Sequence, residues 1–203
     1  LPADPEKMTA LETATEGRRV WLAASTHTGE EEICGCIQRH LKVPFPRLLT
    51  IIVPRHPERG GEIAGILRAS GLQVALRSAG DAIGPETDVY VADTIGELGL
   101  FYRVAEVAFI GKSLAGAGGQ NPLEAAALGC PALFGPDMSN FREMSQRMIE
   151  AGAAEMVADG EGLEAALGRL LAGKRLRRTR SDAGVRYAAG EAEVLDRVIS
   201  DIV

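Results

Sequence analysis

The feature that most restricts the fold of this chain is the alternation of short apolar runs with amphipathic segments from residue 18 to about residue 172. A strand that is buried on both faces of a parallel sheet needs a nearly continuous apolar run, and an amphipathic helix connects it to the next strand. The predicted strands are RRVWLAAST, LLTIIVPR, QVALRS, TDVYVADT, EVAFIGKS, PALFGP and AAEMVAD. The sequence therefore predicts an α/β fold with a doubly wound, Rossmann-like parallel sheet.

Amphipathic segments between these runs are the predicted helices, at residues 30–43, 58–71, 96–105, 121–129 and 140–152. In the first of them, the apolar positions that share one helical face are Ile33, Cys36, Ile37 and Leu41. Ligands of such sheets bind outside the carboxyl ends of the strands, where loops lead into helices. The residues that directly follow each strand are therefore the first place to look for a site.

The pattern divides the chain into three stretches. Residues 1–17 are polar and are expected to form a linker and a short helix, and residues 18–173 are expected to form the α/β domain. Residues 174–203 have only helical patterns and are expected to pack on that domain. A basic strip runs into this last stretch and consists of Arg169, Lys174, Arg175, Arg177, Arg178 and Arg180. A solvated helix face is the favoured interpretation of the strip, and contact with anionic lipid headgroups is the alternative.

Composition excludes several classes of function. The net charge of the 203 residues is -6, which argues against nucleic acid as a partner and favours small molecules or proteins. The three cysteines fit neither a disulfide framework nor a zinc site and are expected to be reduced thiols in a cytoplasmic setting. No apolar run reaches the roughly 18 to 20 residues of a membrane-spanning helix, and the first residues lack the layout of a signal peptide.

The segment VPRHPER, residues 53–59, follows the second predicted strand. Pro54 and Pro57 stiffen this loop and hold Arg55 and His56 at the rim of the sheet. A fixed guanidinium group suits a phosphate or a carboxylate, because its planar fork donates two parallel hydrogen bonds. The alternative is a rigid turn with an exposed arginine.

Two further segments end strands with polar residues. STHTGEEE, residues 25–32, places Ser25, Thr26 and His27 before a helix whose first turn carries three glutamates. These carboxylates are expected to complement the helix dipole, and the alternative role of His27 is contact with a ligand or proton donation. In DTIGELG, residues 93–99, backbone N–H groups near Gly96 are suited to the edge of a planar base, and a glutamate follows in the first helical turn.

The segment GGQNPLEAAALG, residues 118–129, gathers unusual backbone chemistry at the start of a plain helix. Asn121 suits the N-cap, Pro122 the first helical position and Glu124 the third, which is nearly a capping box. Glycines just before a helix let the backbone approach a ligand, and free N–H groups there attract phosphate; these glycines are Gly116, Gly118 and Gly119. The carboxylate of Glu124 is also suited to accept hydrogen bonds from ribose hydroxyls. The dinucleotide and P-loop fingerprints are both absent from the sequence, which argues against a nicotinamide cofactor or an ATPase.

Taken together, these four segments resemble, in this order and spacing, the C-terminal half of 3-deoxy-D-manno-octulosonic acid (Kdo) transferases, the lipid A Kdo transferase family. The resemblance covers roughly residues 18–172. It implies a GT-B glycosyltransferase of two Rossmann-like domains that face each other across a cleft, acting in lipopolysaccharide biosynthesis. The C-terminal domain of such an enzyme binds the donor CMP-Kdo, and the N-terminal domain binds the lipid A precursor. Residues 18–173 would then be a nucleotide-sugar-binding domain.

The resemblance also implies a set of site residues. The CMP site would consist of Pro54, Arg55, Ile95, Gly96, Glu97, Asn121, Pro122, Leu123 and Glu124. Further sugar or phosphate contacts would come from Ser25, Thr26, His27, His56, Lys112, Ser113, Gly118 and Gly119. The family inverts the anomeric centre without a metal or another cofactor. Its general base belongs to the N-terminal domain, so no catalytic residue is expected in this chain.

Two positions depart from the family pattern. Gln120 stands where the family commonly has histidine, which puts proton donation there in doubt. Lys112 interrupts a usual glycine pair, and it either adds a cation for the donor carboxylate or crowds the backbone. Because the chain begins with what resembles the linker between the domains, we expect a donor-binding half that binds nucleotide but transfers nothing alone.

The full-length protein would lie at the cytoplasmic face of the bacterial inner membrane, and the chain itself in the cytoplasm. The other interpretations are a GT-B UDP-sugar glycosyltransferase or sugar epimerase, and a non-catalytic nucleotide-binding module. Preference for CMP over UDP separates a Kdo transferase from a UDP-sugar enzyme. A lack of binding to either nucleotide favours the non-catalytic module.

Overall fold

The computed structural model describes residues 1, 3–116 and 118–200 of the chain, with side chains up to residue 193. One seven-stranded sheet runs through the molecule in the order β3-β4-β2-β1-β5-β6-β7, and every neighbouring pair is parallel. The strands are β1 (Arg19–Thr26), β2 (Leu48–Pro54), β3 (Val74–Leu76), β4 (Val89–Val91), β5 (Val107–Ile110), β6 (Ala132–Phe134) and β7 (Ala154–Met156). Each of the seven predicted apolar runs contains one strand, so the predicted doubly wound α/β fold is confirmed.

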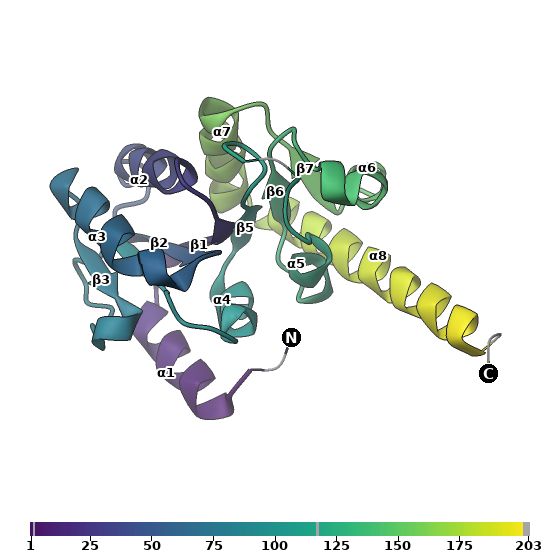
Figure 1. The fold of residues 1–203 in the computed structure, drawn as a ribbon, viewed down its shortest axis with the longest axis horizontal. Coiled ribbons are helices and arrows are strands. Elements are labelled where there is room, and N and C mark those ends of the chain that lie inside the picture. Colours follow the sequence, from purple (N-terminus) through teal and green to yellow (C-terminus); the bar gives the residue numbers. More distant parts are fainter. Residues whose placement is uncertain (2, 117, 201–203) are drawn as a thin grey trace.

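Helices cover both faces of the sheet (Figure 1). One face carries α2 (Glu30–Leu41), α3 (Gly60–Ala69) and α7 (Gly160–Ala172). The other carries α1 (Pro5–Thr15), α4 (Leu98–Val104), α5 (Leu123–Ala127), α6 (Arg142–Glu150) and α8 (Lys174–Ser200). Short 3-10 turns are η1 (Pro57–Arg59), η2 (Arg77–Ala79) and η3 (Ser139–Phe141).

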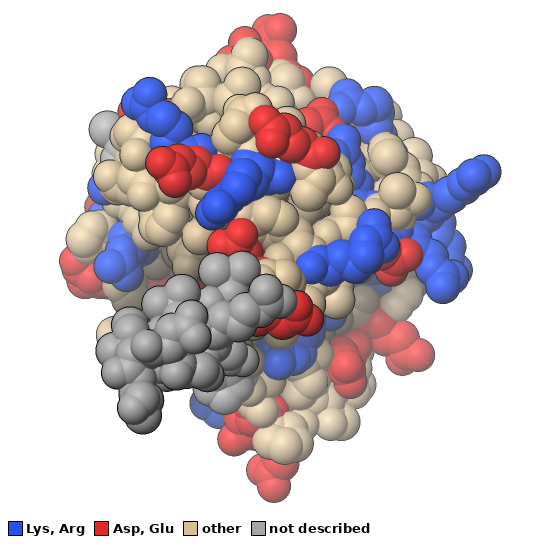
Figure 2. All heavy atoms as spheres, turned by 90° about the vertical axis from the view of Figure 1, so that its right-hand side faces the viewer, with Lys and Arg blue, Asp and Glu red and all other residues tan. Residues whose placement is uncertain are grey.

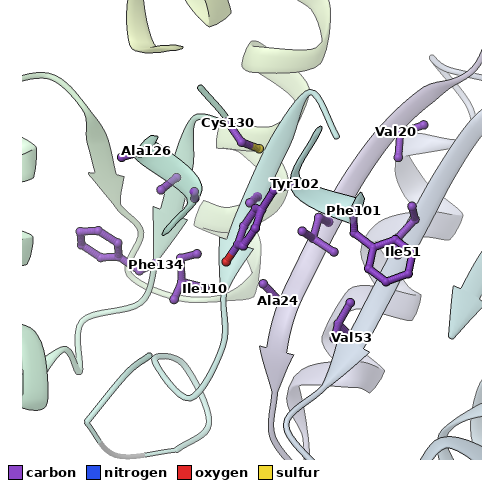
Figure 3. Packing of buried hydrophobic residues seen from close by; sticks show 14 of the residues in the cluster. Val20, Ala24, Ile51, Val53, Phe101, Tyr102, Ile110, Ala126, Cys130 and Phe134 are labelled. Atoms are coloured by element: carbon purple, nitrogen blue, oxygen red, sulfur yellow. The ribbon is translucent and has the colours of Figure 1, made fainter. Parts of the chain in front are cut away.

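The core consists of two layers that the sheet separates. Along β1, Val20 and Leu22 belong to the layer under α4, while Trp21 and Ala23 belong to the layer under α2. This alternation follows from the two-residue period of a strand. Figure 3 shows two neighbouring aromatic side chains of α4 that diverge, with Phe101 beside Ile51 of β2 and Tyr102 beside Ile110 of β5. Burial of large side chains on both faces is what holds this central part of the sheet rigid, at about 1.5–3 kcal/mol for each.

The strand order reverses beside β1. After β1 the chain forms β2 beside it, then β3 at the edge of the sheet and β4 between β3 and β2, and it then crosses to place β5 on the other side of β1. The first gap between helices that cover opposite faces therefore opens between the carboxyl ends of β1 and β5. This switch point is where the sequence directs the search for a site.

The predicted buried face of α2 was wrong in part. Cys34 and Gln38 are buried, whereas Ile33 and Cys36 are only half-buried. Gln38 can be buried because its amide nitrogen donates to the Leu48 carbonyl at 3.1 Å and its amide oxygen accepts from the Thr50 hydroxyl at 2.6 Å. A polar side chain with both of its groups bonded can take an apolar position of the helix, and hydropathy alone cannot detect this.

The two end segments pack on the α/β domain. Asp4 caps α1 by accepting from the N–H groups of Glu6 and Lys7, and Leu11 of the same helix is buried beside α4. The helical pattern expected from residue 174 onward corresponds to one long helix, α8, which contacts α5 and α7. Its Gly184 lies against Ala126 of α5, 3.3 Å from the Ala126 Cα to the position that a Cβ would take. The last expected helical residues, 201–203, lie outside the described residues.

The basic strip is partly turned into the protein. Arg177 donates to the carbonyls of Leu170 and Leu171, and Arg180 donates to those of Gly152 and Ala154. These two guanidinium groups are therefore structural, and neither of the two expected interpretations fits them. On the face that Figure 2 shows, basic and acidic side chains lie interspersed. Among the described residues, no helix has both the length and the apolar character that crossing a bilayer requires.

Candidate functional site

Every segment that the sequence singled out lies at the carboxyl edge of the sheet. Residues 25–32 end β1 and begin α2, residues 53–59 end β2, and residues 93–99 connect β4 to α4. Residues 111–122 connect β5 to α5. Because all strands are parallel, these four connections share one edge, with β1 and β5 at its centre. We therefore predict that Arg55, Gly96 and Glu124 line one common hollow at this edge.

The backbone is strained at the centre of this edge. Among the described residues, the non-glycine residues with positive φ are Ser25 at 56° and Lys112 at 61°. Ser25 is also the residue at which the β1–β2 register shifts. Between them, Gly111 approaches so closely that a Cβ would lie only 2.5 Å from the Ser25 carbonyl oxygen. Such conformations cost free energy and concentrate at functional sites.

Glu30 holds this region together from beneath. Its side chain is 0% exposed, and its Oε2 accepts from the N–H groups of Lys112 at 2.8 Å and His27 at 2.9 Å. Its Oε1 accepts from the N–H groups of three consecutive residues of the β5–α5 connection, at 3.0 Å from Ser113, 3.1 Å from Leu114 and 3.4 Å from Ala115. Five N–H groups thus surround one buried carboxylate, which fits the backbone cavities that bind anions.

Glu31 fixes the loop on the other side of β1. Its side chain is 2% exposed, and its Oε1 accepts from the Thr26 hydroxyl at 2.9 Å and from Arg59 Nη1 at 3.0 Å. Arg59 belongs to VPRHPER, so this ion pair anchors the segment that carries Arg55.

All three glutamates lie in the first turn of α2, where they complement the helix dipole as expected, but Glu30 and Glu31 also form buried bonds to neighbouring segments, whereas Glu32 is exposed. Sequence reasoning missed Glu30, Glu31 and Arg59 as residues that shape the site. The sequence signal that could have found the two glutamates is the run of three acidic residues in the first turn of the helix after β1, because one carboxylate is enough to complement a helix dipole.

Two histidine rings meet where β1 and β2 end. The rings of His27 and His56 lie edge to face with centroids 5.8 Å apart. The N–H of Arg55 donates to the Thr26 carbonyl at 3.0 Å, which ties the ends of β2 and β1 together. The Arg55 side chain is exposed, and within the described part of the chain its guanidinium has no hydrogen-bond or ion-pair partner. It is therefore free to meet an anion.

Glu97 lies at the N-cap position of α4 and not in the first helical turn as expected. It is 9% exposed, and Arg77 binds both of its oxygens, at 2.6 Å and 2.8 Å. Lys7 of α1 donates to it at 2.8 Å, and the Thr94 hydroxyl donates as well. Hydrogen bonds from Arg77, with further ones from Lys7 and Thr94, hold the pKa of this carboxyl well below its usual range although burial opposes the shift.

The Glu97 carboxylate is thus occupied within the protein. What the 94–97 turn offers to a ligand is its backbone and its neighbours, Gly96 with φ 82° and Ile95 with 86% of its surface exposed. A groove of about 410 Å³ adjoins this turn and is lined by Lys7, Arg77, Gly80, Asp81, Tyr90, Thr94 and Glu97.

The start of α5 is displaced by one residue from the predicted cap. Pro122 occupies the N-cap position, and Asn121 Oδ1 accepts from the Leu123 N–H at 3.0 Å. The Glu124 side chain is half-buried and has no partner among the described residues. Its negative charge adds to the effect of burial, and of Cys130, in raising the pKa of Tyr102.

Gly118 and Gly119, which precede α5, form hydrogen bonds and close contacts within the protein. The Gly118 N–H donates to Asp137 Oδ1 at 3.0 Å, and the Gly119 N–H donates to the Lys112 carbonyl at 3.0 Å. Both φ angles are positive, and a Cβ would meet Asn140 at Gly118 and Met138 at Gly119. The expectation that these two N–H groups are free for phosphate was thus wrong. A contact of either glycine with a ligand by other atoms stays a prediction.

The electrostatic arrangement favours an anionic ligand. The Glu30 and Glu31 carboxylates are buried, whereas Arg55 is exposed and Lys112 is half-buried at the ends of the two strands that flank β1. Neither cationic group has a partner within the described residues, so this edge of a chain with net charge -6 carries two unpaired positive charges. Among the side chains of residues 1, 3–116 and 118–193, no group of three or more histidine, cysteine, aspartate or glutamate residues could hold a metal ion.

Curated proteins with similar sequences are 3-deoxy-D-manno-octulosonic acid transferases. No family model matches the chain. The 3-deoxy-D-manno-octulosonic acid transferase of Bordetella pertussis is 41% identical over 189 residues, and that of Haemophilus influenzae is 36% identical over 185 residues. These matches cover 90% and 91% of this chain but 44% and 43% of the relatives. The chain therefore spans less than half the length of the curated relatives it matches.

A solved structure matches nearly end to end. It is the C-terminal CMP-Kdo binding domain of WaaA from Acinetobacter baumannii, 31% identical, with a TM-score of 0.84 over 90% of this chain and 96% of that chain. Further solved structures at 12–16% identity share the fold alone, which is that of the C-terminal domains of GT-B proteins.

We expect Glu30→Gln to lower the free energy of unfolding by about 1–3 kcal/mol, because an amide donor would face N–H groups that need an acceptor. Hydrogen exchange at residues 112–115 should accelerate as well. The matched control is Glu32→Gln, on the same helical turn but exposed, with an expected loss of at most about 0.5 kcal/mol. Equal losses in the two variants would reduce Glu30 to a dipole partner. Denaturant unfolding and amide exchange measure both effects.

We also expect the stability difference between the wild type and Glu97→Gln to depend on pH. The folded pKa of Glu97 is depressed, so its contribution is full above the unfolded carboxyl pKa of about 4.3 and is lost as pH falls below it. At pH 7 the wild type should be more stable by about 2 kcal/mol, and the gap should narrow from pH 5 to pH 2.5. Glu12→Gln, an exposed change on α1, should show no such gap. A gap that is constant with pH would contradict the charge-based role.

Proposed function

Since the chain belongs to the 3-deoxy-D-manno-octulosonic acid transferase family, we propose that it binds the sugar donor CMP-Kdo as the C-terminal half of a GT-B glycosyltransferase. The observation that carries this proposal is that Arg55 and Lys112 follow the two strands that flank β1 and that their cationic groups have no partner within the described residues. A donor with a phosphate and a sugar carboxylate carries negative charges that complement these unpaired positive side chains.

Each part of the nucleotide has a suitable partner. Arg55 pairs with the donor phosphate or the sugar carboxylate, because its guanidinium is free and its backbone is fixed to β1. The backbone of the 95–97 turn holds the cytosine base, with Ile95 against the face of the ring. Glu124 accepts hydrogen bonds from the ribose hydroxyls, which its unpaired carboxylate permits. Pro54, Asn121, Pro122 and Leu123 shape the walls around these contacts.

The chemistry explains why positive groups belong here. Transfer of Kdo passes through an oxocarbenium-like state while CMP leaves as an anion, so cations and N–H donors at the phosphate lower the barrier. The reaction inverts the anomeric centre and uses no metal. The general base comes from the N-terminal domain of the complete enzyme, so residues 1–203 bind donor but transfer no sugar alone.

The complete protein transfers Kdo to a lipid A precursor in lipopolysaccharide biosynthesis. Because that acceptor is a lipid, the protein works at the cytoplasmic face of the bacterial inner membrane. The acceptor contacts lie in the N-terminal domain. The guanidinium groups of Arg177 and Arg180 donate hydrogen bonds to backbone carbonyls within the protein. These two residues of the basic strip therefore do not serve as a membrane contact.

The nucleotide preference tests the proposal directly. We expect CMP to raise the melting temperature of the chain and to bind more tightly than UMP or UDP, because the 95–97 turn selects the base. Titration calorimetry and thermal shift at matched salt measure this. Tighter binding of UDP would favour a UDP-sugar enzyme of the same fold, and no response to any nucleotide at millimolar concentration would favour a non-catalytic module.

Two variants separate the roles within the site. Arg55→Ala should weaken CMP by about 1–3 kcal/mol and leave cytidine nearly unchanged, because only CMP carries the phosphate. Glu124→Gln should weaken the binding of CMP and of cytidine by a similar amount. The affinity for 2′-deoxycytidine, which lacks one ribose hydroxyl, should change little. If Arg55→Ala weakens cytidine as much as CMP, arginine has no role at the phosphate. If Glu124→Gln lowers stability only, the glutamate belongs to the helix start.

A further inference from the structure

We propose that Lys112 is a specificity-determining residue for the anionic groups of the donor, and that the chain retains a strained backbone there in order to hold this cation at the switch point. The inference rests on the proposed function and deepens it. It assigns the second positive charge of the site to a residue on the far side of β1 from Arg55.

The first observation is the conformation of Lys112. Its φ of 61° lies in the left-handed region, where a residue with a Cβ is disfavoured and glycine is not. The surroundings enforce this conformation from both sides. The Lys112 N–H donates to buried Glu30 Oε2 at 2.8 Å, and its carbonyl accepts from the Gly119 N–H at 3.0 Å. Local strain that neighbours over-determine in this way points to a functional residue.

The second observation is that the side chain stabilises little in return. Within the described residues its ammonium group has no ion pair and no hydrogen bond. Its stem is half-buried and lies over Gly116, where the Lys112 Cγ is 2.7 Å from the position that a Cβ would take. A glycine at position 112 would avoid the strain and lose no partner. The fold alone therefore gives no reason for a lysine here.

The third observation is its place relative to the other cations. Lys112 and His27 share one oxygen of Glu30 through their N–H groups, and Arg55 is tied to Thr26. Arg55 follows β2 and Lys112 follows β5, so the two cations flank β1, with two strand spacings of about 10 Å in total between their strands. Side chains of this length reach inward across such a gap from both sides. A ligand with two anionic groups near one another can thus pair with both.

The ligand chemistry that Lys112 recognises is an oxyanion, which in this donor is either the phosphate or the sugar carboxylate. A nucleoside without a phosphate offers it nothing. Lys112 thus lowers the stability of the fold and strengthens ligand binding. Replacement of the lysine by glycine should therefore raise stability and weaken binding.

The test uses residues 1–203 with three variants of Lys112. Lys112→Gly removes the charge and the strain, Lys112→Ala removes the charge and keeps the strain, and Lys112→Arg keeps both. The matched control is Lys174→Ala, which removes an exposed positive charge at the start of α8. The probes are CMP, cytidine, and free Kdo titrated into CMP-saturated protein.

We expect Lys112→Gly to melt at a higher temperature than Lys112→Ala, and no lower than the wild type. Both should weaken CMP, or Kdo in the presence of CMP, about tenfold, while cytidine binding is unchanged and Lys112→Arg stays close to the wild type. A loss for CMP assigns the lysine to phosphate, and a loss for Kdo only assigns it to the carboxylate. Lys174→Ala should change none of these affinities.

Two outcomes overturn the inference while the proposed function stands. One is a wild type that binds CMP and a glycine variant that binds CMP and Kdo equally well. The other is equal melting temperatures for Lys112→Gly and Lys112→Ala, which would remove the strain from the account. A wild type that binds no CMP would instead reject the proposed function, and the inference with it.

Discussion

The buried carboxylate of Glu30 is the interaction on which the rest of this site depends. It accepts hydrogen bonds from five N–H groups that belong to the connections after β1 and after β5. An ionised carboxylate can remain fully buried only when donors surround it, and these donors in turn can point inward only because the carboxylate is there. One side chain therefore fixes the positions of two loops that are more than 80 residues apart in sequence.

The neighbouring residue repeats the arrangement on the other side. Glu31 pairs with Arg59 and thereby anchors the loop that follows β2. Further along the edge, Glu97 binds Arg77 and Lys7 and fixes the turn after β4 to α1. Both oxygens of Glu30 and of Glu97 accept hydrogen bonds, whereas Oε2 of Glu31 has no hydrogen-bond partner among the described residues. Arg55 and Lys112, whose cationic groups are unpaired within the described residues, are positive side chains at this edge in a chain whose net charge is negative.

Rigidity and strain occur together at this edge for a physical reason. The sheet beneath is packed on both faces by large apolar side chains, so it can support unfavourable backbone conformations at Ser25 and Lys112. Close approaches at Gly111 and Gly116 leave no room for larger residues. A preorganised edge of this kind can bind a ligand without first having to order its loops.

The sequence by itself determined the seven strands, the connecting helices and the edge of the sheet that carries the motifs. It could do so because strand and helix periods are local properties of the chain, and because parallel strands present their carboxyl ends together. It could not determine that Glu30 and Glu31 are buried, that Gln38 takes a core position, or that the N–H groups of Gly118 and Gly119 are occupied. Those outcomes depend on which strands become neighbours, and only the tertiary structure brings Lys112 to Glu30, Arg59 to Glu31 and Arg77 to Glu97.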